Sequence, residues 1–418
     1  MRIFKLILII ASCFFTEVKG QNMENNMVHG FVKQGFEPVY EEFTKNFENG
    51  KELGSAFCVY YQGEKVVDLW GGFSDKKKKH EFKENTMVLF FSATKGVASL
   101  CIAKLYSEGK IDYYKKVSAY WPEFAKNGKE NITVSQLLSH QSGLCLWNGK
   151  LPIEQIADSN LLAEKLKNTF PMWIPGHYSG YSAGLAGFFM SELVRRVDDK
   201  HRTLGQYFQE EFATPIGLEF YIGLPDTVSD TSVSYIKLIN PVKRIMTLGK
   251  LPKALRKTVS RPNSLFMKSI TLTKGYNVNE SATWRIEEPS GNGIGTARSV
   301  AYLYSLLVNN AGEISISEEA INELSNSAFI PKYGGTDKVM GIPLYYRNGF
   351  MKNGEGSSVY NNKSCFGFGG ASGSMAFADP INKIGYCYVP NKMGYDFPDG
   401  REKNIQKVLY ECIERLKE

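Results

Sequence analysis

Ser92 and Lys95 stand three residues apart in the stretch FFSATKGVASL, residues 90–100. Residues at this spacing share one face of a helix, so the Lys95 amine is within reach of the Ser92 hydroxyl. A serine at a helix start also lies near the positive end of the helix dipole, which favours negative charge on a nearby oxygen. The pair therefore indicates a serine nucleophile with an amine as its proton acceptor, which is the chemistry of acyl transfer.

The spacing alone is a weak signal, because Ser-x-x-Lys also occurs at Ser74–Lys77, Ser107–Lys110 and Ser234–Lys237. The first of these pairs lies in a lysine run, the second at a helix end and the third in an irregular basic segment. Only Ser92 opens a predicted buried helix after an apolar stretch. The context therefore favours Ser92 over the other three serines as the nucleophile.

Tyr181 is the candidate for proton transfer beside this pair. It lies in PGHYSGYSAGLAGFF, just before a predicted helix, where a phenol can project from a loop into a cleft. Tyr178 is an alternative, and a packing role is open for both. The glycine-rich stretch FGFGGASGS (366–374) can bring a strand backbone close to a substrate, or else marks a bulge or tight sheet packing.

The elements that must position these groups are strands near both chain ends and helices between them. Strand patterns occur at 56–61 and 65–70 around a tight turn, and at 372–380 and 384–392 around another turn. Helical patterns occur at 92–109, 133–143, 183–197, 203–217 and 401–418. The predicted fold is therefore mixed α/β (α+β), with a sheet built from the N- and C-terminal segments, flanking helices and an inserted helical domain.

The predicted domain division follows this order of elements. It consists of a signal peptide at 1–20, a discontinuous sheet domain at 21–88 and 283–418, and a helical insertion domain at 89–282 that contains a basic segment at 237–274.

The first twenty residues have the layout of a secretory signal peptide. Arg2 and Lys5 precede the apolar run LILIIASCFF, and small residues suited to cleavage precede Gln21. The run is too short to cross a bilayer core of about 30 Å, and no later stretch approaches a membrane span. The chain is therefore expected to be secreted or to enter an endomembrane lumen.

Export would make two further features relevant. Three glycosylation sequons occur, at Asn131, Asn279 and Asn362. Six cysteines follow the predicted signal peptide, and they are either paired in disulfides or buried as free thiols.

The formal net charge is +7, and the excess is local. Residues 237–274 hold ten Lys and Arg residues and no Asp or Glu, so this segment is either a solvated surface or a contact for an anionic surface. It lacks the interleaved aromatic residues and the motifs of nucleic-acid binders, so no nucleic-acid partner is expected. No oligomeric state is predicted.

Other kinds of site find little support in the sequence. The five histidines are scattered without zinc-ligand spacing, so no metal site is expected. GNGIG and FGFGG lack the strand–turn–helix context of dinucleotide binding, and no cofactor is expected.

Several stretches in one order resemble the serine β-lactamase and penicillin-binding-protein-like superfamily, and most nearly its branch of class C-like esterases. These stretches are VVDLWGGFSD, FFSATKGVASL, EGKIDYYKKVSAYWPEFA, ITVSQLLSHQSGL, PGHYSGYSAG, LGQYFQEEFATPIGLEFYIGLP, GNGIGTA and FGFGGASGSMAFADP. The resemblance covers nearly the whole mature chain. It implies an antiparallel sheet of the β-lactamase/transpeptidase type.

The resemblance also implies a role for each candidate residue. Ser92 would be the acyl-accepting nucleophile, and Lys95 would help to deprotonate it. Tyr181 would act as base and then as acid for the leaving group. The backbone N–H groups of Ser92 and Ala371 would form the oxyanion hole.

The third motif departs from the family pattern. Where the family usually has Lys-Thr-Gly or His-x-Gly, this chain has Phe368, Gly369 and Gly370. The missing cation argues against β-lactam or D-Ala-D-Ala peptide substrates and weighs less against neutral esters. Two functions follow as expectations. One is a serine hydrolase that acts on small esters or amides through an acyl-enzyme, and the other is a catalytically silent relative with a binding or self-assembly role.

Overall fold

The structure is a computed structural model that describes residues 27–418, so the predicted signal peptide lies outside the described residues. Its centre is an eight-stranded sheet in which every neighbouring pair is antiparallel. From edge to edge the strands are β1 (Val28–Val32), β3 (Glu64–Gly72), β2 (Gly54–Tyr61), β13 (Ile384–Pro390), β12 (Met375–Asp379), β11 (Phe366–Gly369), β10 (Phe350–Lys352) and β9 (Tyr345–Arg347). The predicted mixed fold with an antiparallel sheet is confirmed.

The two ends of the chain meet inside this sheet. β2, from the N-terminal part, pairs with β13, from the C-terminal part, in a register that places Cys58 opposite Cys387. β12 and β13 form a hairpin around residues 380–383. All six cysteines of the described chain are buried free thiols, which is the second of the two alternatives that the sequence left open.

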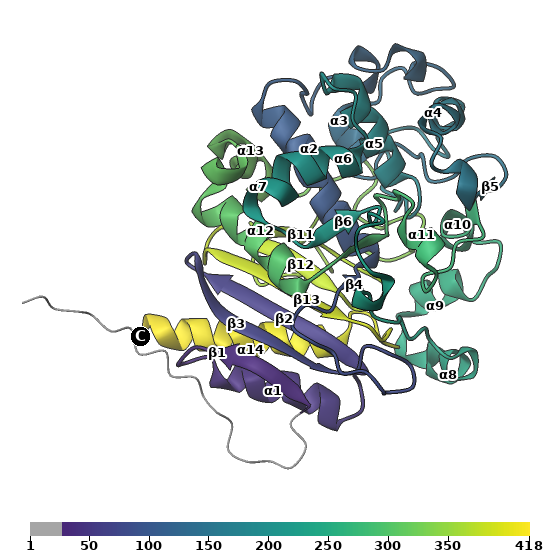
Figure 1. The fold of residues 1–418 in the computed structure, drawn as a ribbon. Coiled ribbons are helices and arrows are strands. Elements are labelled where there is room, and N and C mark those ends of the chain that lie inside the picture. Colours follow the sequence, from purple (N-terminus) through teal and green to yellow (C-terminus); the bar gives the residue numbers. More distant parts are fainter. Residues whose placement is uncertain (1–26) are drawn as a thin grey trace, which may run out of the picture.

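Helices cover both faces of the sheet (Figure 1). α1 (Glu37–Glu48) and α14 (Gly400–Lys417) pack against each other on one face. α12 (Ala297–Asn309) lies on the other face against β2, β12 and β13, next to α2 (Thr94–Ser107), which contacts β10 and β11. The sheet is thus enclosed on both sides, as a sheet with two apolar faces requires.

Helix α2 carries the Ser-x-x-Lys pair into the protein interior. Each of its residues from Thr94 to Leu105 is buried, which explains why its apolar positions run around most of the helix. Gly96 faces β11, where an added Cβ would come within 2.3 Å of the Tyr304 hydroxyl and 3.3 Å of the Phe368 Cβ. The missing side chain at position 96 therefore lets the strand lie close to the helix.

Between the sheet segments the chain is mostly helical. The helices here are α3 (Val134–Leu138), α4 (Ser159–Lys167), α5 (Ala186–Val197), α6 (Leu204–Phe208), α7 (Thr214–Ile216), α8 (Pro241–Thr247), α9 (Lys253–Val259), α10 (Leu265–Ser269) and α11 (Ser281–Trp284), and α13 (Glu318–Ser325) follows α12. Short 3₁₀ turns occur at Phe91–Ala93, Val117–Ala119, Pro122–Phe124, Ile153–Gln155, Asp230–Ser232, Leu248–Lys250 and Ala311–Ile314. A small sheet has the order β4 (Val88–Leu89), β8 (Gly293–Gly295), β6 (Phe220–Ile222), and β5 (Leu151–Pro152) pairs with β7 (Thr273–Lys274).

Two of the expected helices differ in length from the sequence pattern. α3 has the predicted N-cap, with Thr133 and Gln136 in a capping box, but it ends at Leu138 rather than at Gly143. The helix expected over 203–217 is divided into α6, a π-helical turn (Gln209–Ala213) and α7. Within residues 27–418 no helix combines the length and the apolar character that a membrane crossing requires.

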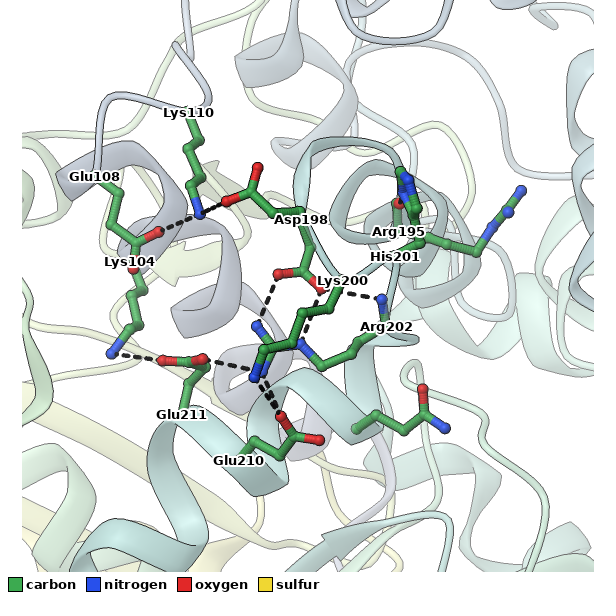
Figure 2. Close-up of polar contacts among 12 residues, drawn as sticks. Lys104, Glu108, Lys110, Arg195, Asp198, Lys200, His201, Arg202, Glu210 and Glu211 are labelled. Atoms are coloured by element: carbon green, nitrogen blue, oxygen red, sulfur yellow. Dashed lines mark hydrogen bonds and ion pairs between the residues drawn. The ribbon is translucent and has the colours of Figure 1, made fainter.

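A partly buried ion network connects the C-terminal end of α5 to this interrupted helix. Figure 2 shows Arg202 among three carboxylates, those of Asp198, Glu210 and Glu211. The guanidinium binds Asp198 through two nitrogens, at 2.7 and 2.9 Å, and Lys104 of α2 lies 3.3 Å from Glu211. Hydrogen bonds from Arg202 lower the pKa of Asp198. The network therefore joins α2, α5 and the π-helical turn.

Replacing Arg202 with methionine is expected to lower the free energy of unfolding by about 3 kcal/mol, because the buried Asp198 would keep its charge without its partner. Chemical denaturation followed by circular dichroism measures this change. Lys200→Met removes an exposed charge from the same loop and should change stability by less than about 0.5 kcal/mol. Equal stability of the two variants would contradict this role of Arg202.

Candidate active site

The hydroxyl of Ser92 lies between the side chains of Tyr181 and Lys95. The Tyr181 phenol donates a hydrogen bond of 2.6 Å to Ser92 Oγ, and Lys95 Nζ lies 3.3 Å from the same oxygen. Ser92 and Lys95 come from neighbouring turns, whereas Tyr181 comes from the loop before α5. The structure thus brings the predicted Tyr181 and Lys95 side chains within hydrogen-bonding distance of the Ser92 hydroxyl.

Ser92 occupies a strained turn rather than the first turn of an α-helix. The residues Phe91–Ala93 form a 3₁₀ turn that leads into α2. Phe91 has a φ of +49°, a left-handed conformation that is uncommon for a bulky residue. Strained backbone conformations of this kind are frequent at functional sites, where the surrounding structure stabilises them. Here the strained turn directs Ser92 into a cavity beside Tyr181.

Lys95 is fully enclosed and has three polar neighbours. Its Nζ donates to the carbonyl oxygens of Ala183 and Ser290, each at 2.7 Å, and the third neighbour is Ser92 Oγ. Burial lowers the pKa of Lys95 to about 7, and the nearby Glu288 partly offsets that effect. When the Lys95 amine is neutral, its two N–H groups donate to these two carbonyl oxygens, and its lone pair is directed at Ser92 Oγ. Lys95 can therefore accept the Ser92 proton near neutral pH.

Tyr181 is protonated at neutral pH. Burial raises the pKa of its phenol well above the ordinary value, more than the hydrogen bond to Ser92 lowers it. The group can therefore donate or relay a proton, but it does not begin as a phenolate. The alternative tyrosine, Tyr178, lies under the ammonium of Lys338 at 4.0 Å from its ring and beside Tyr333, away from Ser92.

The third-motif strand places a phenyl ring where the family has a cation. Phe368 on β11 is buried, and its ring centroid lies 6.2 Å from those of Tyr181 and Tyr346. His140 packs edge-on against Tyr181, but burial and the nearby Lys95 lower the pKa of His140 to about 3. That histidine is uncharged at neutral pH, so it does not replace the missing cation.

The end of β11 lies directly against the turn that carries Ser92. An added Cβ at Gly370 would come within 2.3 Å of the Phe90 carbonyl oxygen and 3.3 Å of the Ala93 nitrogen. Gly369, Gly370 and Ala371 line the same cavity as Ser92. The predicted oxyanion hole from the N–H groups of Ser92 and Ala371 stays a prediction, and this close approach is the arrangement that such a pair of donors needs.

Glu288 and Ser290, which lie in the loop before β8, were not predicted from the sequence. Glu288 is half-buried, lines the cavity and accepts a hydrogen bond from the Ser290 N–H at 3.1 Å. Burial raises the pKa of Glu288 above its ordinary value, although Lys95 and Ser290 oppose that change. The available signal was the position of EEPS immediately before GNGIG. It identifies a turn but not the approach of that turn to Lys95.

Replacing Glu288 with glutamine is expected to move the acid limb of the kcat/KM profile to lower pH. The Glu288 carboxylate stabilises the Lys95 ammonium and so raises the pKa of Lys95. Without that charge the amine loses its proton at lower pH, and the midpoint should fall below the value of about 7 set by Lys95. Rates on a neutral ester across pH measure the shift.

Glu280→Gln, which changes an exposed carboxylate, is the control for this profile. A loss of rate in Glu288→Gln without movement of the midpoint would mean that Glu288 only supports the loop. A movement to higher pH would contradict the electrostatic argument.

The cavity beside Ser92 has a volume of about 900 Å³ and a mostly apolar lining. Its walls come from distant segments, including Leu255 of α9, Phe266 of α10, Leu344 before β9 and Met375 of β12. Within the part of the chain that the structure describes, no group of three or more His, Cys, Asp or Glu side chains is arranged to hold a metal ion.

This fold and this arrangement of serine, lysine and tyrosine define a serine hydrolase of the β-lactamase and penicillin-binding-protein type. The chain belongs to the Beta-lactamase family, whose sequence model matches residues 41–410. The predicted superfamily and its esterase branch are therefore confirmed.

Relatives with esterase names cover most of this chain. The protein "Esterase/beta-lactamase LipL" of Mycobacterium tuberculosis is 29% identical over 88% of this chain and 83% of its own length. A family VIII carboxylesterase of known structure is 32% identical, with a TM-score of 0.78 over 92% of this chain and 99% of that one. A penicillin-binding-protein homologue from Caulobacter crescentus is 33% identical, with a TM-score of 0.79 and the same coverage.

Proposed function

We propose that this chain hydrolyses neutral carboxylic esters, and small amides less readily, through an acyl-enzyme on Ser92. The observation that carries the proposal is the position of Ser92 Oγ, 2.6 Å from the Tyr181 phenol and 3.3 Å from the Lys95 amine. Relatives named as esterases over most of the chain support the same chemistry. The catalytic assignments of Ser92, Lys95 and Tyr181 are part of the proposal.

Acylation would begin with attack of Ser92 Oγ on the ester carbonyl carbon. The Ser92 proton passes to Lys95, whose lowered pKa makes the neutral amine available. The tetrahedral oxyanion would accept hydrogen bonds from the N–H groups of Ser92 and Ala371. When the carbon–oxygen bond of the ester breaks, the Tyr181 phenol gives its proton to the departing alcohol and regains one from Lys95.

Deacylation would use the same groups in reverse order. A water molecule takes the place of the departed alcohol and attacks the acyl carbonyl carbon. Its proton moves through Tyr181 to Lys95, and the proton on Lys95 returns to Ser92 Oγ as the acyl–oxygen bond breaks. The products are a carboxylic acid and the free Ser92 hydroxyl, so the site ends in its starting state.

The lining of the cavity supports uncharged, apolar acyl groups as substrates. Phe368 offers no charge to a substrate carboxylate, and the uncharged His140 does not supply one. Apolar side chains from α9, α10 and β12 surround the space next to Ser92. An ester with an apolar acyl chain gains from that burial, whereas an anionic β-lactam would lose hydration without an opposite charge.

The silent alternative is less well supported than hydrolysis. A site that has lost its chemistry has no need to keep a buried lysine with a lowered pKa, a strained turn at the serine and a short Tyr181–Ser92 hydrogen bond. The buried lysine and the strained turn cost stability, and all three features lie at one oxygen, Ser92 Oγ.

A fluorophosphonate probe tests the proposal directly, because it reacts covalently with activated serine nucleophiles. The wild-type protein should gain the mass of one probe molecule, located by peptide mass spectrometry at Ser92. Ser92→Ala should gain none. Equal labelling of the two proteins, or no labelling of the folded wild type, would overturn the proposed function.

We also propose that the chain is exported and glycosylated, with Asn131 as the main acceptor. Asn131 is exposed, whereas the Asn279 side chain is engaged with the backbone of Ile236 through both its amide nitrogen and its oxygen. Asn362 donates from its amide nitrogen to Asp379 at 2.8 Å. A glycan on Asn279 or Asn362 would displace these bonds.

Treatment of native material with an N-glycan-removing enzyme should therefore increase its gel mobility, and Asn131→Gln should abolish most of that shift. Absence of a shift in material from the producing organism would contradict export or occupancy.

A further inference from the structure

Helix α8 lies at the periphery of the molecule (Figure 1), and several of its apolar side chains are exposed to solvent. Val242, Ile245 and Met246 are 66%, 71% and 78% exposed, and the preceding Leu238 is 51% exposed. The first three share one helix face through their i, i+3 and i+4 spacing. Single exposed apolar residues are ordinary, but a helix face made of three such neighbours is typical of a contact surface.

The opposite face of the same helix is part of the active-site wall. Arg244 and Thr247 of α8, together with Leu248 and Leu251 in and after the 3₁₀ turn that follows it, line the cavity that contains Ser92. α8 therefore separates the apolar interior of the cavity from the outside, with apolar side chains toward solvent. A molecule that contacts the outer face lies one helix diameter from the substrate cavity.

The surroundings of this face are strongly basic. Residues 237–274 contain ten basic and no acidic side chains, and Lys243, Lys253 and Lys257 are all exposed. Among residues 27–418 only one of the ten, Lys250, forms an ion pair, with Asp396 at 3.7 Å. An apolar stripe bordered by unpaired lysines is the composition of segments that lie in the interface of anionic membranes.

We propose that α8 and the basic residues around it dock on an anionic lipid surface, and that the substrate is an amphiphilic ester taken from that surface. The apolar face of α8 enters the boundary between headgroups and acyl chains, and the lysines bind the headgroup phosphates. The apolar cavity behind α8 then receives the acyl chain with little exposure to water. The substrate part of this inference rests on the proposed ester hydrolysis, whereas the docking part does not.

Charge favours a lipid surface over the other possible occupants. Two copies of this chain that met through α8 would bring two sets of unpaired positive charges together, which opposes self-association. A soluble polyanion would use the lysines but has no need of Val242, Ile245 and Met246. An anionic lipid surface satisfies both features, and it is continuous with the apolar cavity.

Docking is tested on the full chain carrying Ser92→Ala, so that the result is independent of turnover. Sedimentation is measured with vesicles of phosphatidylcholine alone and of an equal mixture with phosphatidylglycerol. The protein should bind the mixed vesicles and bind phosphatidylcholine weakly. Replacing Val242, Ile245 and Met246 together with serine should weaken binding more than about tenfold.

A charge variant and a matched control separate the two contributions. Replacing Lys243, Lys253 and Lys257 with serine should lower the partition coefficient about fivefold for each charge removed. Ile330→Ser with Ile381→Ser removes apolar side chains of similar exposure elsewhere and should change nothing. Circular dichroism shows whether each variant is folded, and Ile245→Ser alone serves if the triple variant is not.

Three outcomes would overturn the docking proposal. The first is equal binding of the protein to both vesicle types, and the second is a loss of vesicle binding in the control variant as large as in the apolar variant. The third is a loss of binding in the charge variant with no loss in the apolar variant, which would indicate a soluble polyanion as the partner. Concentration-dependent dimerisation that the apolar variant abolishes, without vesicle binding, would assign the surface to a second copy instead.

The substrate part is tested with active protein. Hydrolysis of a long-chain ester in mixed vesicles should fall more than about tenfold in the apolar variant, in parallel with binding. Hydrolysis of a short soluble ester should stay unchanged, because those side chains do not line the cavity. If the apolar variant kept full activity on both esters, the substrate part of the proposal would be wrong. A wild type that binds vesicles but resists the fluorophosphonate probe would instead refute the proposed function and leave docking intact.

Discussion

Ser92→Ala is expected to lower kcat/KM for a soluble neutral ester by about four to six orders of magnitude. The substitution removes the only hydroxyl that both the Tyr181 phenol and the Lys95 amine contact in this site, at 2.6 and 3.3 Å. Without it no acyl-enzyme forms, and the residual rate comes from binding and from the oxyanion donors. Steady-state hydrolysis with chromatographic detection of the acid product measures this loss.

Ser74→Ala provides a matched control, because Ser74 has the same spacing to a lysine but lies in an exposed loop. Its kcat/KM should equal that of the wild type. Binding of a non-hydrolysable ester analogue should persist in Ser92→Ala, since the rest of the cavity lining is unchanged. A rate in folded Ser92→Ala within tenfold of the wild-type rate would exclude a covalent mechanism on this serine.

Lys95→Met is expected to lower kcat/KM by about two to four orders of magnitude, which is the usual contribution of a general base. Methionine fills much of the space of the lysine chain and removes only the amine. It also removes the group with a pKa of about 7. The wild-type kcat/KM should rise with pH through about 7 as Lys95 loses its proton, and the variant should lose that step.

Lys129→Met is the control for this second prediction. Lys129 is also buried and donates to two backbone carbonyls, those of Lys167 and Thr169, but it lies away from the cavity. Its replacement should change stability and leave the pH profile in place. If Lys95→Met kept the step near pH 7, the titrating group would be another one, and the role of Lys95 would be electrostatic support.

The phenyl ring at position 368 changes the chemistry that this site favours. In the family pattern a cation stands beside the serine and tyrosine, whereas here Phe368, Tyr346 and Tyr181 form an aromatic wall. Lys95 Nζ lies 6.0 Å from the Phe368 ring. The wall excludes water from the amine and so contributes to its low pKa. The departure from the family motif therefore removes anion recognition but keeps the proton acceptor.

Some features of this protein were predictable because they depend on neighbouring residues. The Ser92–Lys95 pair follows from a spacing of three, and the strands β2, β3, β12 and β13 follow from their composition and turns. The N-cap at Thr133 is a local signal of the same kind. The π-helical turn within the predicted helix over 203–217 was not predicted, and two of its residues, Glu210 and Glu211, form ion pairs with Arg202 and Lys104 from other parts of the chain.

The amino-acid sequence by itself determined the types of the reacting groups and the short-range spacing of Ser92 and Lys95. Only the tertiary structure decided which tyrosine meets the serine, since Tyr181 lies 89 positions away along the chain. The tertiary structure also decided that the carbonyl oxygen of Ser290, 195 positions from Lys95, accepts a hydrogen bond from the Lys95 amine, and that Glu288 lies near that amine. The physical reason is that burial sets the pKa values in this site, and burial depends on segments that become neighbours only when the chain folds.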